Sequence, residues 1–226
     1  MKRIKDLVAL CEEQPFSIEK IQAYICDNKL NSEEITRAAI AVCEYGMFSY
    51  DTFRFQNNRE PQPQELITYN WERLFDVFIE HGLDAELVMY DDGKDGENIL
   101  QSLQFLDDGD LGARILRNIL LKGGNPNVVI DGHPFFEEVD ADFVIDIQMG
   151  LYPEKWQVDN AFRFWLVLMG FGGVIRDGKC AVHLCKGFEM EEFREFEKFD
   201  YKITYKEQGF ELQIFRKGTG DLVATV

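Results

Sequence analysis

The sequence predicts a mainly α-helical chain that is built from repeated units and ends in a small antiparallel β-meander. Three observations support this fold class. Apolar helices that stop at glycine recur along the chain, Asp-Gly turns follow several of these stops, and apolar and polar residues alternate near the C-terminus. The stretch from Asp110 to Glu138 contains the whole pattern: a helix, a glycine stop, an Asp-Gly turn and a new apolar segment.

The helix in this stretch is the clearest of the chain. Asp110 is expected to cap its N-terminus. Gly123 and Gly124 are expected to end it, because a left-handed C-terminal cap favours a residue without a Cβ atom. The turn dipeptide Asp131-Gly132 then leads into the next apolar segment. The helix has one apolar stripe, made of Leu111, Ile115, Leu116, Ile119 and Leu120.

Three further segments repeat this helix and its stop. They are Ala38 to Phe48, Leu74 to Asp84 and Phe164 to Gly173. The stops Gly46, Gly82, Gly124 and Gly170 are 36, 42 and 46 residues apart. Periods of this size are typical of helical repeat arrays.

Three turns share one frame, namely Asp95 to Gln101, Asp131 to Glu137 and Asp177 to His183. Each resembles the ankyrin signature D-G-x-T-P-L-H, and the segment around Gly123 resembles the ankyrin segment that closes the second helix. The resemblance covers residues 32–185. It implies an ankyrin-like solenoid over residues 31–187, with residues 1–30 as an N-terminal helical cap. Residues 188–226, a helix and a β-meander, are expected to pack on the repeats as one unit.

The two ends of the chain depart from the repeat pattern. Lys5 to Cys11 and Ser17 to Asp27 predict two short helices, and Asn31 or Ser32 begins the next. Near the C-terminus, Glu189 to Phe199 predicts a Glu-rich helix. Three strands should follow and cover the last apolar face of the array. Their alternating apolar residues are Tyr201, Ile203, Tyr205, Phe210, Leu212 and Ile214, and Leu222 to Val226 supplies the third strand.

Two segments permit less definite predictions. Gln56 to Gln64 is the most polar and proline-bearing stretch, and we expect a mobile loop there. Ala161 to Met169 is apolar almost all round, which fits either a deeply buried helix or a buried strand.

The composition narrows the classes of partner. The chain has 41 acidic and 24 basic side chains and a net charge of −17, which disfavours nucleic acid and anionic membranes as partners and favours a basic partner. Solubility alone would also explain such a charge. Five cysteines without framework spacing indicate a reducing compartment, and we expect a cytoplasmic protein. The apolar run Leu7 to Cys11 is too short for a signal peptide, and no segment predicts a membrane span.

No motif predicts a catalytic, metal or cofactor site. Cys180, His183 and Cys185 are one ligand short of a closed zinc site, and the resemblance places His183 at the ankyrin histidine. The segment Gly170 to Gly173 lacks the sixth-position glycine of a dinucleotide loop, so we interpret it as a helix cap. We therefore expect a protein that is not an enzyme and carries no cofactor. The alternative is a hydrolase or metal-dependent enzyme assembled from distant carboxylates.

The predicted function is binding of another protein through an acidic surface. In a repeat array the turn tips and first-helix faces line up, and acidic residues there would steer a basic partner and then pair with its Lys and Arg side chains. In size and charge the chain resembles immunity proteins, which bind and neutralise a basic toxin, although generic scaffolding also fits. We expect a monomer. The predicted partner-binding residues are Asp91, Asp92, Asp95, Glu97, Asp131, Glu137 and Glu138.

Overall fold

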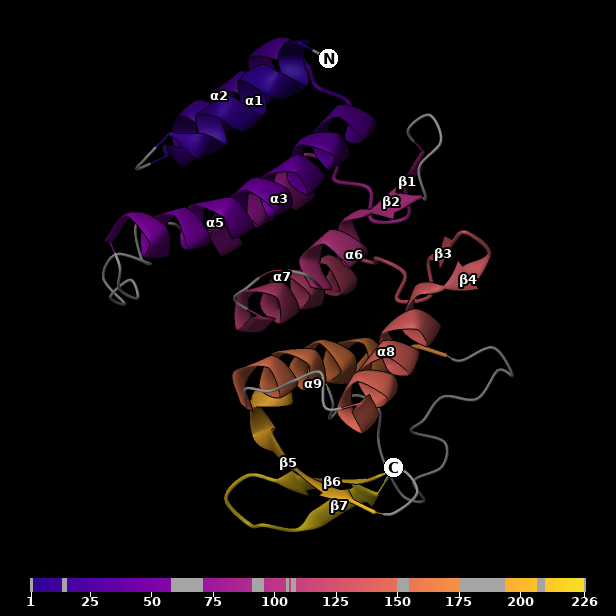
Figure 1. Ribbon diagram of the computed structural model, residues 1–226. Coiled ribbons are helices and arrows are strands. Elements are labelled where there is room, and N and C mark those ends of the chain that lie inside the picture. Colours follow the sequence, from indigo (N-terminus) through magenta and orange to yellow (C-terminus); the bar gives the residue numbers. More distant parts are fainter. Residues whose placement is uncertain are drawn as a thin grey trace. The chain divides into compact units, whose positions relative to one another are not determined.

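The computed structural model describes residues 2–13, 16–57, 71–90, 96–104, 106, 109–149, 155–174, 194–206 and 210–225. Within these residues the chain is mainly helical and carries a three-stranded antiparallel sheet near its C-terminus, as the sequence predicts (Figure 1). The chain divides into two compact units, Met1–Gly124 and Asn125–Val226.

The first unit is built from pairs of helices. They are α1 (Lys2–Glu12), α2 (Ile18–Asn28), α3 (Ser32–Asn57), α5 (Trp71–Glu80), α6 (Ile99–Gln104) and α7 (Gly109–Leu121). Helix α1 packs on α2, α3 on α5, and α6 on α7. The first members of the pairs also contact one another in the order α1, α3, α6, and the second members in the order α2, α5, α7. The predicted apolar stripe of α7 is buried at four of its five residues, Ile115, Leu116, Ile119 and Leu120.

Two local features shape the helices of the first unit: a glycine at a close helix contact and a capping box at a helix start. A Cβ atom at Gly112 of α7 would lie 2.6 Å from the carbonyl oxygen of Leu103 in α6, so glycine permits the two helices to approach. At the start of α3, Asn31 and Glu34 form a reciprocal capping box: the Asn31 Oδ1 accepts from the Glu34 amide at 2.9 Å, and the Glu34 Oε2 accepts from the Asn31 amide at 3.2 Å. The predicted start of this helix is therefore confirmed.

The second helices of the first unit all end in one kind of turn. The residues Lys29, Gly82 and Gly123 have φ angles of 48°, 99° and 99°. Each donates its amide to a carbonyl three residues earlier, and the following amide donates to a carbonyl five residues earlier, at 3.2 Å, 2.8 Å and 3.1 Å respectively. These two bonds define a Schellman cap. The predicted stops at Gly82 and around Gly124 are thus confirmed.

Two sequence predictions about helix ends are wrong. Gly46 does not stop a helix, because α3 continues through it to Asn57. A glycine inside a helix costs only about 1 kcal/mol, which the rest of a 26-residue helix outweighs. Asp110 lies inside the first turn of α7, which begins at Gly109, and so is not its N-cap. The predicted loop at Gln56 to Gln64 lies outside the described residues, except for the end of α3.

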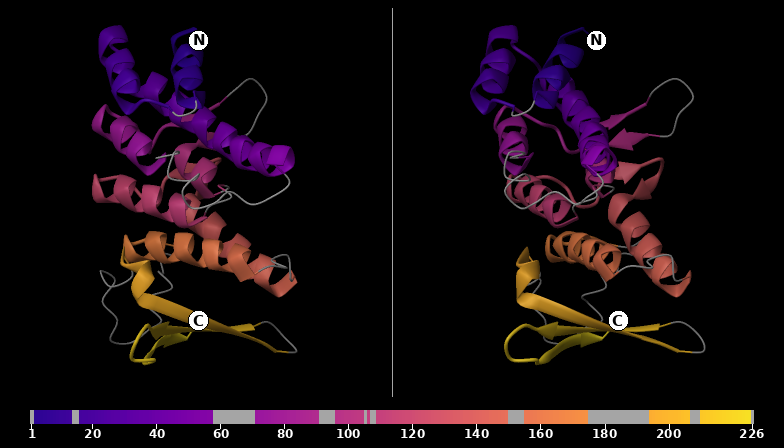
Figure 2. Two further views of the ribbon diagram at one scale, coloured as in Figure 1. Left: turned by 90° about the vertical axis from the view of Figure 1, so that its left-hand side faces the viewer. Right: turned by 60° about the vertical axis from the view of Figure 1, so that its left-hand side comes forward.

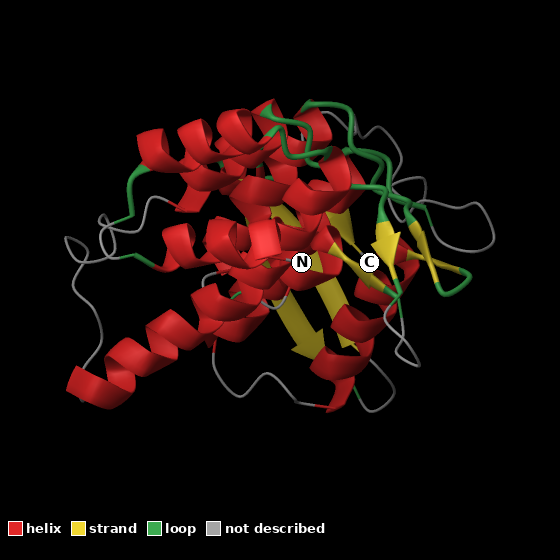
Figure 3. Cartoon of the chain, turned by 90° about the horizontal axis from the view of Figure 1, so that it is seen from above, coloured by secondary structure: helices red, strands yellow, loops and turns green. Residues whose placement is uncertain are grey.

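Two short β-hairpins follow second helices (Figure 3). In the first unit β1 (Val88–Met89) pairs with β2 (Glu97–Asn98), and in the second unit β3 (Val129–Ile130) pairs with β4 (His133–Pro134). Asp131 and Gly132 connect β3 to β4 with φ angles of 49° and 84°. Two positive φ angles in a two-residue connection are the mark of a type I′ turn, so the predicted Asp-Gly turn is confirmed.

The second unit has an aromatic core between two helices, α8 (Phe135–Met149) and α9 (Lys155–Gly170). The Ala161 to Met169 segment is therefore helix and not strand. Trp165 of α9 is 1% exposed, and its indole Nε1 donates to the Asp140 carboxylate of α8 at 2.7 Å. Beyond α9, Gly172 and Gly173 form the same Schellman cap as in the first unit, with Gly173 donating to the Leu168 carbonyl at 2.9 Å. The rings next to Trp165 belong to Phe136, Phe143 and Phe162. The Phe135 and Phe164 rings of the same core pack edge to face with one another.

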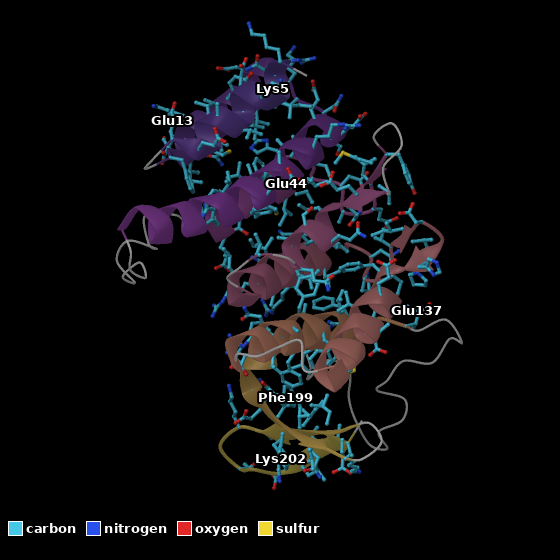
Figure 4. The ribbon with its side chains drawn as sticks, viewed as in Figure 1. Lys5, Glu13, Glu44, Glu137, Phe199 and Lys202 are labelled. Carbon is cyan, nitrogen blue, oxygen red and sulfur yellow. The ribbon has the colours of Figure 1, made fainter. Side chains whose placement is uncertain are left out.

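The C-terminal sheet lies beside α9 in both views of Figure 2. Its antiparallel strands are β5 (Phe199–Tyr205), β6 (Phe210–Arg216) and β7 (Leu222–Thr225), which confirms the predicted meander. The Tyr201 ring lies 4.4 Å from that of Phe162, and its hydroxyl donates to Asp159 at 2.7 Å. In Figure 4, Phe199 lies on the α9 side of the sheet and Lys202 on the opposite side, consistent with their buried and exposed positions. The sheet thus covers α9.

The predicted Glu-rich helix before the sheet is wrong at its C-terminal end. Residues 189–193 lie outside the described residues, Phe196–Lys198 form a single 3-10 turn (η3), and Phe199 already belongs to β5. Phe199 is buried and Tyr201 and Ile203 are half-buried, whereas the residues between them are exposed, and this period of two favours the strand.

Candidate partner-binding surface

The two hairpins are held by the same local framework. In the first unit the Asp84 carboxylate accepts from the Glu86 amide at 2.9 Å, and in the second the Asn125 side chain accepts from the Asn127 amide at 2.9 Å. Such Asx turns fix the chain direction immediately after a helix cap. The paired strand residues Met89 and Ile130 are both buried, so each hairpin is anchored at its base.

Asn98 fixes the base of the first hairpin. It is fully buried, and its Nδ2 donates to the carbonyls of Ala85 at 3.0 Å and Leu87 at 2.8 Å. Its Oδ1 accepts from the Leu100 amide at 2.9 Å, and the Gln101 side chain accepts from the Asn98 amide at 3.1 Å. One side chain therefore joins β2, the loop before β1 and the start of α6. This arrangement gives the hairpin a fixed position on its own unit.

Asn127 has a related role in the second unit. Its Nδ2 donates to the Gly172 carbonyl at 3.0 Å, and its Oδ1 accepts from the Val174 amide at 2.8 Å. The Phe135 amide also donates to the Val128 carbonyl at 2.7 Å, which ties the start of α8 to the residue before β3. The sequence patterns did not predict the roles of Asn98 and Asn127. No local signal marks these two asparagines, because Asn98 follows the Gly82 stop by 16 residues and Asn127 follows the Gly123 stop by four.

The predicted partner-binding acids fall in three groups. Asp91, Asp92 and Asp95 lie outside the described residues. Glu97 lies in β2 of the first unit, opposite Met89, and is half-buried. In the second unit Asp131 is exposed at the hairpin turn. Glu137 and Glu138 lie in the first turn of α8 and are half-buried, and Figure 4 labels Glu137 there. The structure thus brings the last three acids to one hairpin and the helix that follows it.

Each hairpin also exposes a large apolar side chain. Tyr90, directly after β1, is 60% exposed, and Val129 of β3 is 57% exposed. Neither residue was predicted as part of the surface, because a sequence pattern does not separate exposed apolar residues from buried ones. Each hairpin therefore has both an exposed apolar side chain and a carboxylate, Glu97 in the first and Asp131 in the second.

Burial shifts the pKa values of three groups in the helical part of the structure. Burial raises the pKa of the Cys11 thiol to about 12 and raises that of the Cys43 thiol further, so both thiols are inert packing groups. Burial also raises the pKa of Asp140, opposed by the hydrogen bond from Trp165. In the part of the chain that the structure describes, no three His, Cys, Asp or Glu side chains form a metal-binding group. Cys180, His183 and Cys185, which the sequence analysis did not accept as a zinc site, are outside that part.

No helix among the described residues has the length and apolar character needed to cross a bilayer. The chain matches no protein-family model, and no curated protein and no solved structure is significantly similar to it. A binding surface is therefore inferred from the residues of this chain alone.

Proposed function

We propose that the helix pairs are ankyrin-like repeats and that the chain binds a basic protein through the acidic hairpin surface, without catalysis. The acids that we assign to binding are Asp91, Asp92, Asp95 and Glu97 in the segment 91–97 and Asp131, Glu137 and Glu138 in the segment 131–138. An inhibitor or immunity protein is the specific form of this proposal.

Recurrence of one framework supports the repeat part of the proposal. A Schellman cap, an Asx turn, a two-residue strand and a helix that starts after its partner strand occur in this order twice, from Gly82 to Ile99 and from Gly123 to Phe135. In the ankyrin frame Asn98 and Gln101 stand at the positions of Thr and His, and they bond to one another across the start of α6. The cap at Gly172 supports α8 and α9 as a further copy.

The proposal that the partner is basic rests on the net charge of −17. A surface of this sign attracts a basic protein over distances of about 10 Å at moderate salt and raises its association rate. Asp131 is exposed on a rigid type I′ turn, and its neighbours Glu137 and Glu138 lie in the first turn of a helix. Because the backbone of these residues is already ordered in a turn or a helix, only side-chain freedom is lost when they pair with Lys or Arg.

Charge reversal at the first hairpin tests the proposal. The purified chain serves as bait in a capture experiment, and a triple variant with Asp91, Asp92 and Asp95 changed to Lys is compared with it. We expect the association rate of the captured basic partner to fall by about tenfold or more. A matched control changes the exposed residues Asp6, Glu12 and Asp27 of the first two helices to Lys, which alters net charge by the same amount. An equal loss in both variants would contradict a localised surface.

A further inference from the structure

The two hairpins share a base but differ in the connection between their strands. In the second hairpin two residues separate the paired residues Ile130 and His133, whereas in the first hairpin seven separate Met89 from Glu97. The longer connection begins with Tyr90 and ends with Gly96. Tyr90 and Gly96, at the two ends of this connection, distinguish the first hairpin from the second.

The Tyr90 ring lies against the backbone of Gly96. A Cβ atom at Gly96 would come within 2.8 Å of the Tyr90 Cε1 atom and 3.1 Å of its Cζ atom, and within 2.7 Å of a Val88 methyl carbon. Only glycine leaves room for the ring in this position. Gly96 itself is buried, whereas Tyr90 remains 60% exposed. The ring is therefore supported from one side and open to solvent over most of its surface.

The backbone beneath the ring is fixed by the bonds already described. Asn98 is two residues from Gly96, and its side chain bonds to the loop before β1 and to the start of α6. A supported ring on a fixed backbone has little conformational freedom left to lose when a partner binds. Tyrosine has this property in many binding surfaces, because it offers a large contact area and few rotatable bonds.

We propose that Tyr90 is an anchoring residue that stacks with an arginine side chain of the basic partner. This inference rests on the proposed function, because it assumes that the partner is basic. The face of a tyrosine ring attracts a cation, and the planar guanidinium stacks on such a face better than the compact ammonium of lysine. The acidic character of the chain supplies the complementary charge.

Calorimetry at low salt tests this inference. It measures the affinity of the full chain for a nona-arginine peptide and for a nona-lysine peptide. We expect the arginine peptide to bind more tightly. The variant Tyr90→Leu keeps a large apolar side chain and removes the ring, and it should bind the arginine peptide about two- to fivefold more weakly. Tyr90→Phe should retain most of the affinity. Gly96→Ala, which displaces the ring, should resemble Tyr90→Leu.

Leu121→Ala is the matched control, because Leu121 is 53% exposed in the same unit and lies outside the hairpin. Its affinity should equal that of the parent chain. If Tyr90→Leu binds the arginine peptide as tightly as the parent, the inference is overturned and the acidic surface stands. If the parent chain binds neither peptide, the inference and the proposed function both fail. Equal unfolding midpoints of the variants show that a loss of affinity is not a loss of fold.

Discussion

The first and second hairpins differ in how their geometry is fixed. The β3–β4 hairpin is closed by a two-residue Asp-Gly turn, so local backbone preferences fix the connection between its strands. The β1–β2 hairpin has a longer connection, and the buried side chain of Asn98 holds the base of its strands. One framework of cap, Asx turn and strand therefore accepts tips of different length.

The largest expected effect is on the base of the first hairpin. Asn98→Ala removes three hydrogen bonds and leaves the carbonyls of Ala85 and Leu87 and the amide of Leu100 without this partner. Each unsatisfied buried group costs about 1 to 3 kcal/mol. Because the structure around position 98 can relax and recover part of this cost, we expect the free energy of unfolding to fall by about 2 to 4 kcal/mol. Urea unfolding measures this change in the free energy of unfolding. Asn125→Ala, which removes one hydrogen bond of the second hairpin, should cost about 1 kcal/mol. Equal losses would contradict the difference between the hairpins.

A smaller effect is expected at the turn of the second hairpin. Gly132 has a φ angle of 84°, and a Cβ atom there would meet nothing within 4 Å. Gly132→Ala should therefore show only the cost of a positive φ angle, about 1 to 2 kcal/mol. Gly123→Ala, with a φ angle of 99° and similarly open surroundings, is the matched comparison at a helix cap. A thermal unfolding midpoint unchanged in both variants would show that these turns do not need glycine.

Features controlled by neighbouring residues were predictable from the sequence. Glycine stops, the Asp-Gly turn and the alternating strands of the meander depend on residues a few positions apart, and the structure confirms them. Gly46 shows the limit, because a glycine also occurs inside a long helix when the rest of that helix is favourable. The N-terminal helices were predicted to within a few residues for the same local reasons.

Features that join distant residues were not predictable. Asn98 bonds to residues 11 and 13 positions earlier, and Asn127 to residues 45 and 47 positions later. Nothing in a local pattern distinguishes these asparagines from surface ones. The same limit applies to the candidate surface. Acidic composition indicated its charge, but only the structure showed that Glu137 and Glu138 are half-buried and that Tyr90 is exposed.

The salt dependence of partner association is the sharpest test of binding through an acidic surface. Stopped-flow measurement of the association rate of the captured partner, from low to physiological ionic strength, requires no substitution in the chain. Since exposed charges are screened over about 8 Å at physiological salt, we expect a steep fall in the association rate with a much smaller change in the dissociation rate. An association rate that stays constant over this range would contradict an acidic binding surface.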